Sequence, residues 1–123
     1  MGIQPSEITY RFVEALNKKF QGTNTPAGAI AFSAEHGGKQ RGQFFDRIVL
    51  PNLRSSPDGS DAHAFVDRKT GNLYRAASWA LPVFDVRYDL SREDDFRLAV
   101  ELADPYGNYL RRNYARKTFA GII

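Results

Sequence analysis

The sequence predicts an α+β fold: an N-terminal helix, a central antiparallel sheet of three to five strands, and a C-terminal helix or helix pair. Three observations predict this order. Apolar residues recur every four positions near the N-terminus, two short strand-like runs surround a glycine turn within residues 62–77, and a second helical pattern begins after an acidic stretch near residue 93. The chain has 123 residues, which suits one domain, so we treat residues 1–123 as a single domain.

The first predicted element is a helix that begins after Ser6 and stops before Gly22. Ser6 is a favoured N-cap residue, Pro5 precedes it, and a glycine directly after the last apolar residue is a common helix stop. We expect the apolar face of this helix to pack on the sheet. That face is formed by Ile8, Phe12, Leu16 and Phe20.

Residues 21–42 are predicted to connect this helix to the sheet. Residues 27–32 are mostly small and apolar, which indicates either a short strand or a place where another element packs closely. Residues 36–42, His-Gly-Gly-Lys-Gln-Arg-Gly, resemble a phosphate-binding loop in composition, but Gln40 stands where that pattern requires Ser or Thr. We expect a basic surface loop here, with an anion contact as the alternative.

The sheet is predicted from the middle of the sequence. Residues 44–50 form a strand candidate that a proline ends, and residues 51–61 form a loop rich in Pro, Ser, Asp and Gly. The strongest local signal is a β-hairpin over residues 62–77, in which Gly71 can adopt the left-handed conformation that closes the turn. Residues 83–88 are the last strand candidate.

The C-terminal part is predicted to be helical. Ser91 and Asp94 have the spacing of a capping box, and the acids of residues 93–95 favour the positive end of a helix dipole. An apolar helical face follows and ends before Pro105. Residues 106–117 are the candidate second helix.

Composition excludes several classes of protein and site. The sequence has no cysteine, so disulfides, thiolate metal sites and cysteine nucleophiles are excluded. His36 and His63 have no further ligands at zinc-binding spacing, and the nucleophile-elbow motif of serine hydrolases is missing. No apolar run approaches the length of a membrane span, and the N-terminus lacks the features of a signal peptide. We therefore expect a protein that is not an enzyme and that uses no metal, cofactor or membrane partner.

The charge distribution indicates an anionic partner or a subunit contact. The net charge is +3, and twelve of the seventeen basic residues are arginine, which binds phosphates in a forked geometry and stacks on bases. Residues 85–104 hold seven acids and three bases, whereas residues 105–123 hold four bases and no acid. These segments either neutralise each other, within the chain or between subunits, or leave the basic tail free to bind an anion.

Aromatic residues beside arginines are the most suggestive functional feature. Single-stranded nucleic acids are bound by rings that stack on bases and by cations that follow the phosphates, and sheets with exposed aromatics often serve this role. The same residue types suit a pocket for a small nucleotide. For Trp79 a place in the core is the alternative. The predicted ligand-binding residues are Tyr74, Arg75, Trp79, Arg87, Tyr109, Arg111, Arg112 and Arg116.

Residues 64–82 carry the pattern F-V-D-x-x-T-G-x-L-Y-[KR]-x-A-S-W-x-x-P, and a late arginine, Arg87, follows it. This segment, about a sixth of the chain, resembles one found in small uncharacterised phage-encoded proteins. The resemblance implies a phage context and no particular activity. The matching residues are Phe65, Val66, Asp67, Thr70, Gly71, Leu73, Tyr74, Arg75, Ala77, Ser78, Trp79 and Pro82.

The sequence thus predicts a non-catalytic, phage-type binding protein that holds single-stranded nucleic acid through arginines and exposed aromatics. One alternative is a homo-oligomeric or virion structural protein, in which the acidic helix of residues 93–104 docks on the basic tail of a neighbouring copy. Another alternative is a protein that sequesters a small signalling nucleotide. We expect a homo-oligomer that acts in the host cytoplasm, with the virion as the alternative location.

Overall fold

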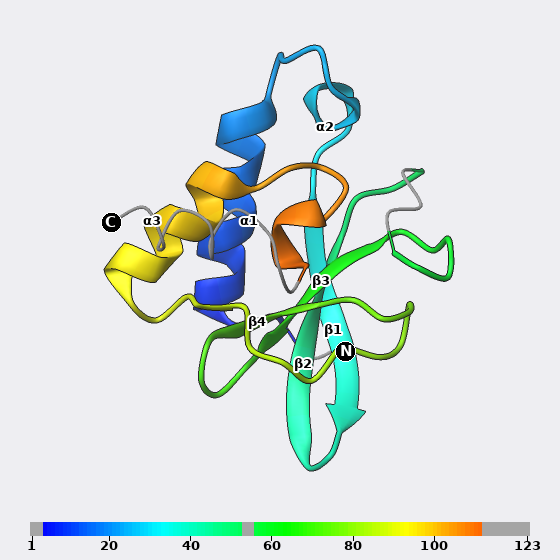
Figure 1. The fold of residues 1–123 in the computed structure, drawn as a ribbon, viewed down its shortest axis with the longest axis vertical. Coiled ribbons are helices and arrows are strands. Elements are labelled where there is room, and N and C mark those ends of the chain that lie inside the picture. Colours follow the sequence, from blue (N-terminus) through cyan, green and yellow to red (C-terminus); the bar gives the residue numbers. More distant parts are fainter. Residues whose placement is uncertain (1–3, 53–55, 112–123) are drawn as a thin grey trace.

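The centre of the fold is a five-stranded antiparallel sheet with the strand order β1-β2-β3-β4-β5. Helices α1 and α3 lie together on one side of this sheet (Figure 1). The structure, a computed structural model, describes residues 4–52 and 56–111. It confirms the predicted α+β class with an N-terminal helix, an antiparallel sheet and a C-terminal helix. In chain order the elements are α1 (Glu7–Phe20), α2 (Pro26–Ala29), β1 (Ser33–Gln40), β2 (Gln43–Val49), β3 (Ala62–Asp67), β4 (Asn72–Arg75), β5 (Tyr88–Asp89), α3 (Glu93–Leu102) and the 3-10 turn η1 (Asn108–Leu110).

Helix α1 packs the predicted apolar face against the sheet. Phe12 and Leu16 are completely buried, and Phe20 is nearly so. Ser6 is the N-cap residue, as predicted, but its hydroxyl makes no cap within the helix. The hydroxyl instead donates to Oδ2 of Asp46 on β2, 3.0 Å away. The start of the helix is therefore tied to a strand.

The helix-facing side of the sheet carries the main apolar core. Successive residues of a strand point to opposite faces, so each central strand contributes every second side chain to this layer. Helix α3 closes the layer with Ala99, and the chain after α3 adds Tyr109 and Leu110. The buried strand residues of the layer are Ile48, Ala64, Val66, Leu73 and Tyr88.

The opposite side of the sheet is covered by the chain that follows β4. This segment turns back through a bridge between Ala76 and Pro82 and then places Phe84 on the sheet. Phe84 packs against a buried cluster of aromatic rings, which meet edge to face at centroid distances of 5.5–6.5 Å. Strand β3 is buried along its whole length because both of its faces are covered. The rings of the cluster are Phe45, Phe65 and Tyr74.

Strand β1 lies where the sequence predicts a basic loop. It pairs with β2, and the register shifts at a β-bulge between His36 and Lys39. Gly37 is buried, and a Cβ there would lie 3.0 Å from a carbonyl oxygen of β2. Gly38 has a φ of 92°, which is left-handed backbone that side chains disfavour. The loop prediction is wrong, because these glycines serve a bulge within a strand.

Two other strand predictions also differ from the structure. Residues 27–32 contain helix α2 and no strand, and a Cβ at Gly28 would clash with the backbone of nearby Thr23 in the same turn. The strand predicted over residues 83–88 is reduced to β5. Its first part leaves the sheet ladder because Phe84 packs onto the aromatic cluster.

Helix α3 confirms the predicted C-terminal helix and is joined to α1. The residue before it, Arg92, is the N-cap, so the predicted cap at Ser91 lies one position too early. Lys19 of α1 donates hydrogen bonds of 2.7–2.8 Å to three carbonyls at the C-terminal end of α3, where a cation is favourable. The helix predicted over residues 106–117 is only the turn η1 in its described part, and residues 112–117 lie outside the described residues.

Candidate nucleic-acid interface

The turns of two hairpins lie at the same end of the sheet. Phe45 of β2 pairs with Asp67 of β3, so the start of β2 is level with the end of β3. The amide of Arg68 donates to the carbonyl oxygen of Phe44 across this end, 3.0 Å away. Residues 39–44 and 67–70, named here the hairpin-end surface, hold four bases and one acid. The four bases are Lys39, Arg41, Arg68 and Lys69.

Phe44 is the exposed aromatic residue of the hairpin-end surface. Its neighbour Phe45 points to the buried aromatic cluster, so Phe44 points to the helix side, where its ring is 48% exposed. The Lys39 ammonium lies 5.3 Å from the centre of the Phe44 ring. The His36 ring lies 6.5 Å from the same centre. An accessible ring and a cation therefore stand side by side.

A cavity of about 640 Å³ opens beside this ring, between the two turns. Its volume is within the usual range for small-molecule sites. Apolar surface from Phe44 and basic side chains from the β3–β4 turn share its wall, so it combines stacking area with positive charge. The lining residues are Gly42, Gln43, Phe44, Asp67, Arg68, Lys69 and Thr70.

Asp67 shapes the β3–β4 turn. Its Oδ1 accepts the backbone N–H of Lys69 at 2.8 Å and that of Thr70 at 3.3 Å, while its Oδ2 accepts Nε2 of Gln43 at 2.8 Å. Among the described residues this carboxylate makes no ion pair. Its acceptor capacity is used to hold the turn.

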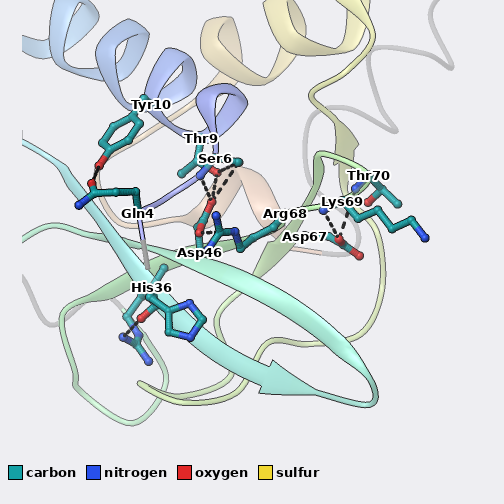
Figure 2. Close-up of polar contacts among 11 residues, drawn as sticks. Gln4, Ser6, Thr9, Tyr10, His36, Asp46, Asp67, Arg68, Lys69 and Thr70 are labelled. Atoms are coloured by element: carbon teal, nitrogen blue, oxygen red, sulfur yellow. Dashed lines mark hydrogen bonds and ion pairs between the residues drawn. The ribbon is translucent and has the colours of Figure 1, made fainter. Parts of the chain in front are cut away.

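Asp46 is a buried carboxylate behind the hairpin-end surface. Figure 2 shows it beneath the first turn of α1, with the Arg68 side chain reaching toward it. Its Oδ2 accepts the N–H of Ser6 at 2.8 Å, the hydroxyl of Ser6 at 3.0 Å and the hydroxyl of Thr9 at 2.7 Å. Its Oδ1 lies 3.5 Å from Nε of Arg68. The charge is thus compensated by a helix N-terminus and one arginine.

The opposite end of the sheet is closed by His63. Its Nδ1 lies 3.2 Å from the carbonyl oxygen of Pro105, so this nitrogen carries the proton, and Nε2 accepts the hydroxyl of Tyr109 at 2.8 Å. Burial lowers the pKa of His63 to about 4, against the smaller raising effects of Asp104 and the Pro105 carbonyl. The histidine is a neutral structural group that docks the chain after α3.

Two of the aromatic residues predicted as ligand contacts are buried. Tyr74 belongs to the aromatic cluster, and the Tyr109 ring is covered by the core, so the expectation that these two rings are exposed is wrong. Trp79 is 39% exposed, but the Arg47 guanidinium lies 4.2 Å from its ring centre, and the Trp79 carbonyl accepts Nε of Arg47 at 2.7 Å. None of the three rings belongs to the hairpin-end surface.

The predicted arginines gather elsewhere as well. Nη2 of Arg87 donates to the carbonyl oxygen of Arg111 at 2.8 Å, and Arg75 and Arg111 line one small cavity together with His63. This group lies toward the end of the sheet that is opposite the two turns. Arg112 and Arg116 lie outside the described residues.

Sequence reasoning missed Phe44 and Arg68, although a signal for each was present. Two consecutive phenylalanines in a strand must point to opposite faces of the sheet. Both can be buried only if other segments pack on both faces, and no segment in the sequence is predicted to do so at Phe44. Both hairpin turns are basic, and an antiparallel meander brings alternate turns to the same end of a sheet.

Within residues 4–52 and 56–111, no cluster of three or more His, Asp or Glu side chains could hold a metal ion. No helix in this described part is long and apolar enough to cross a membrane. No curated protein and no solved structure matches the chain significantly. A family model does match residues 6–112, under the description "Family of unknown function (DUF7717)". Because this match covers most of the length of the chain, the chain belongs to this family.

Proposed function

We propose that this protein is a non-catalytic binding protein for single-stranded nucleic acid and that the hairpin-end surface holds the strand. The observation that carries the proposal is the exposed Phe44 ring, with the Lys39 ammonium 5.3 Å from its centre and an open cavity between two basic turns beside it. Base-on-ring stacking combined with cations along the backbone is how proteins bind single strands.

The arrangement favours a single strand over a duplex. The Lys39 ammonium lies over one face of the Phe44 ring, so a base would stack on the other face, and only an unstacked base can present its own face in this way. Lys39 at the end of β1 contacts the ring, and Arg68 and Lys69 of the other turn line the cavity beside it. A strand that crosses from one turn to the other can therefore place a base on Phe44 and phosphates beside the three cations.

Negative charge next to the β3–β4 turn limits the length of strand that fits. The Leu90 amide donates to the Gly71 carbonyl of this turn at 2.9 Å. Asp89 pairs with Asn72, the residue after Gly71, and Asp95 accepts the Asp89 amide at 2.7 Å, so acidic side chains lie close to the turn. Because these carboxylates repel phosphates, we expect a short footprint with about three phosphate contacts.

Phe44→Ala is expected to weaken binding of a fluorescently labelled dT10 about 5- to 150-fold, because stacking contributes about 1–3 kcal/mol per base. Fluorescence anisotropy at low salt measures the effect. Tyr106→Ala removes a ring that is equally exposed but lies at the other end of the sheet, so it should bind like the wild type. Equal affinity for wild type and Phe44→Ala would refute the proposed stacking.

The salt dependence tests the phosphate contacts. With about three contacts, the slope of log affinity against log salt should be about −2, at about −0.7 per phosphate on a single strand. The double variant Lys39→Ala with Lys69→Ala should reduce the slope to about −0.7, whereas Lys18→Ala on the exposed side of α1 should leave it unchanged. If the double variant had the same salt slope as the wild type, the proposal would be contradicted.

A further inference from the structure

Within the described part of the chain, the Arg68 guanidinium has an ion-pair partner only at Nε. Nε faces Oδ1 of Asp46 at 3.5 Å, and the Arg68 side chain keeps 25% of its surface exposed. Among the described residues, neither Nη atom of Arg68 makes a hydrogen bond or ion pair. The side chain also lines the cavity beside Phe44.

Asp46 is itself held rigidly, which makes it a firm support for Arg68. The residue is completely buried, and Ser6 and Thr9 direct three hydrogen bonds of 2.7–3.0 Å to its Oδ2. Oδ1 accepts no hydrogen bond from the described residues, so it is directed to the arginine alone. Figure 2 shows the Arg68 side chain running back to Asp46, whereas the Lys69 side chain extends away from it.

We propose that Arg68 is the phosphate-binding fork of the hairpin-end surface and that Asp46 is the residue that positions it. The recognised unit is then one nucleotide, whose base stacks on Phe44 and whose phosphate accepts two N–H groups from the Nη atoms of Arg68. This proposal rests on the proposed function and adds the identity of the group that binds phosphate.

The physical reason is preorganisation. A guanidinium offers a planar pair of donors that matches two phosphate oxygens, and a lysine offers only a point charge. An unconstrained arginine loses side-chain entropy when it binds, whereas the ion pair with Asp46 restricts Arg68 before any ligand arrives. Lys39 and Lys69 then attract the phosphates by their charge alone. Arg68 fixes the orientation of the bound phosphate.

A pair of charge-conserving variants tests this difference. Arg68→Lys retains the charge but loses the fork, so affinity for labelled dT10 should fall about tenfold while the salt slope stays unchanged. The matched control Lys69→Arg should bind within about twofold of the wild type. An Arg68→Lys variant that binds like the wild type would overturn the proposal, whereas absence of binding by the wild type would overturn the proposed function itself.

The role of Asp46 is tested without altering it. In ¹⁵N NMR spectra of the wild-type protein, the Nε–H of Arg68 should exchange with water more slowly than that of an exposed arginine before any ligand is added, because its side chain is three-quarters buried and Nε pairs with a buried carboxylate. Arg97, whose side chain is 78% exposed in a surface pair, is the control that should exchange fast. On addition of dT10 the Nη signals of Arg68 should shift most. Fast exchange of the Arg68 Nε–H in the free protein would refute the positioning by Asp46.

Discussion

Asp46→Ala is expected to lower the free energy of unfolding by about 3–5 kcal/mol, because it removes one partner of a buried charge network. The substitution takes three hydrogen bonds from Ser6 and Thr9, and the Thr9 hydroxyl is itself fully buried. It also removes the charge that Arg68 faces. The start of α1 would lose its attachment to β2, so the effect should concentrate in that helix.

Urea denaturation of purified Asp46→Ala measures the loss in the free energy of unfolding. Amide hydrogen exchange shows which part of the protein is destabilised. Glu14→Ala is the matched control: it removes an exposed carboxylate from the outer side of α1 and should change stability by less than about 0.5 kcal/mol. Exchange protection in the first turns of α1 should be lost only in Asp46→Ala. A destabilisation below about 1 kcal/mol would show that the network is not the anchor of the helix.

Acid should destabilise the protein through His63 in the range from about pH 6.5 down to about pH 4. Burial lowers the pKa of this histidine to about 4 in the folded state, while the unfolded chain has the ordinary value of 6.5. The unfolded state therefore takes up a proton first as pH falls, and stability present at neutral pH is lost. The expected loss relative to neutral pH is about 2 kcal/mol at pH 5 and about 3 kcal/mol at pH 4.

His63→Gln separates this titration from that of the carboxylates. A glutamine retains one donor for the Pro105 carbonyl and one acceptor for the Tyr109 hydroxyl, but it does not ionise. Thermal or urea unfolding of both proteins between pH 7.5 and pH 5 should show a stability difference that changes by about 2 kcal/mol across this interval. Parallel pH profiles for the two proteins would mean that His63 titrates normally.

Much of the fold follows from local sequence patterns. The apolar face of α1, the β2 strand and the hairpin of β3 and β4 are confirmed because spacing and turn residues determine them over short distances. Strand β1 could not be predicted in the same way. Its glycines are required by the close approach of β2, which is a tertiary contact, and the same residues in isolation are typical of a loop.

The candidate site was predicted by residue type but not by place. Aromatic residues beside arginines direct attention to Tyr74 and Tyr109, yet neighbours in a strand point to opposite faces, and the segment after β4 covers the face of Tyr74. Tyr109 is buried because its hydroxyl is needed by His63. Phe44 lies two residues closer to the β1–β2 turn than Asp46, which is bound by the start of α1, so its exposure depends on where the helix begins over the sheet.

We propose that the hairpin-end surface binds single-stranded nucleic acid. The most direct measurement is a ¹H–¹⁵N NMR titration of the full chain with dT10, which reports on every assigned amide at once. The largest shifts should fall on residues 39–44 and 67–70, and the amides around Arg75 and Arg111 should stay unchanged. Shifts concentrated around Arg75 and Arg111, or no shifts at a saturating concentration of dT10, would contradict it.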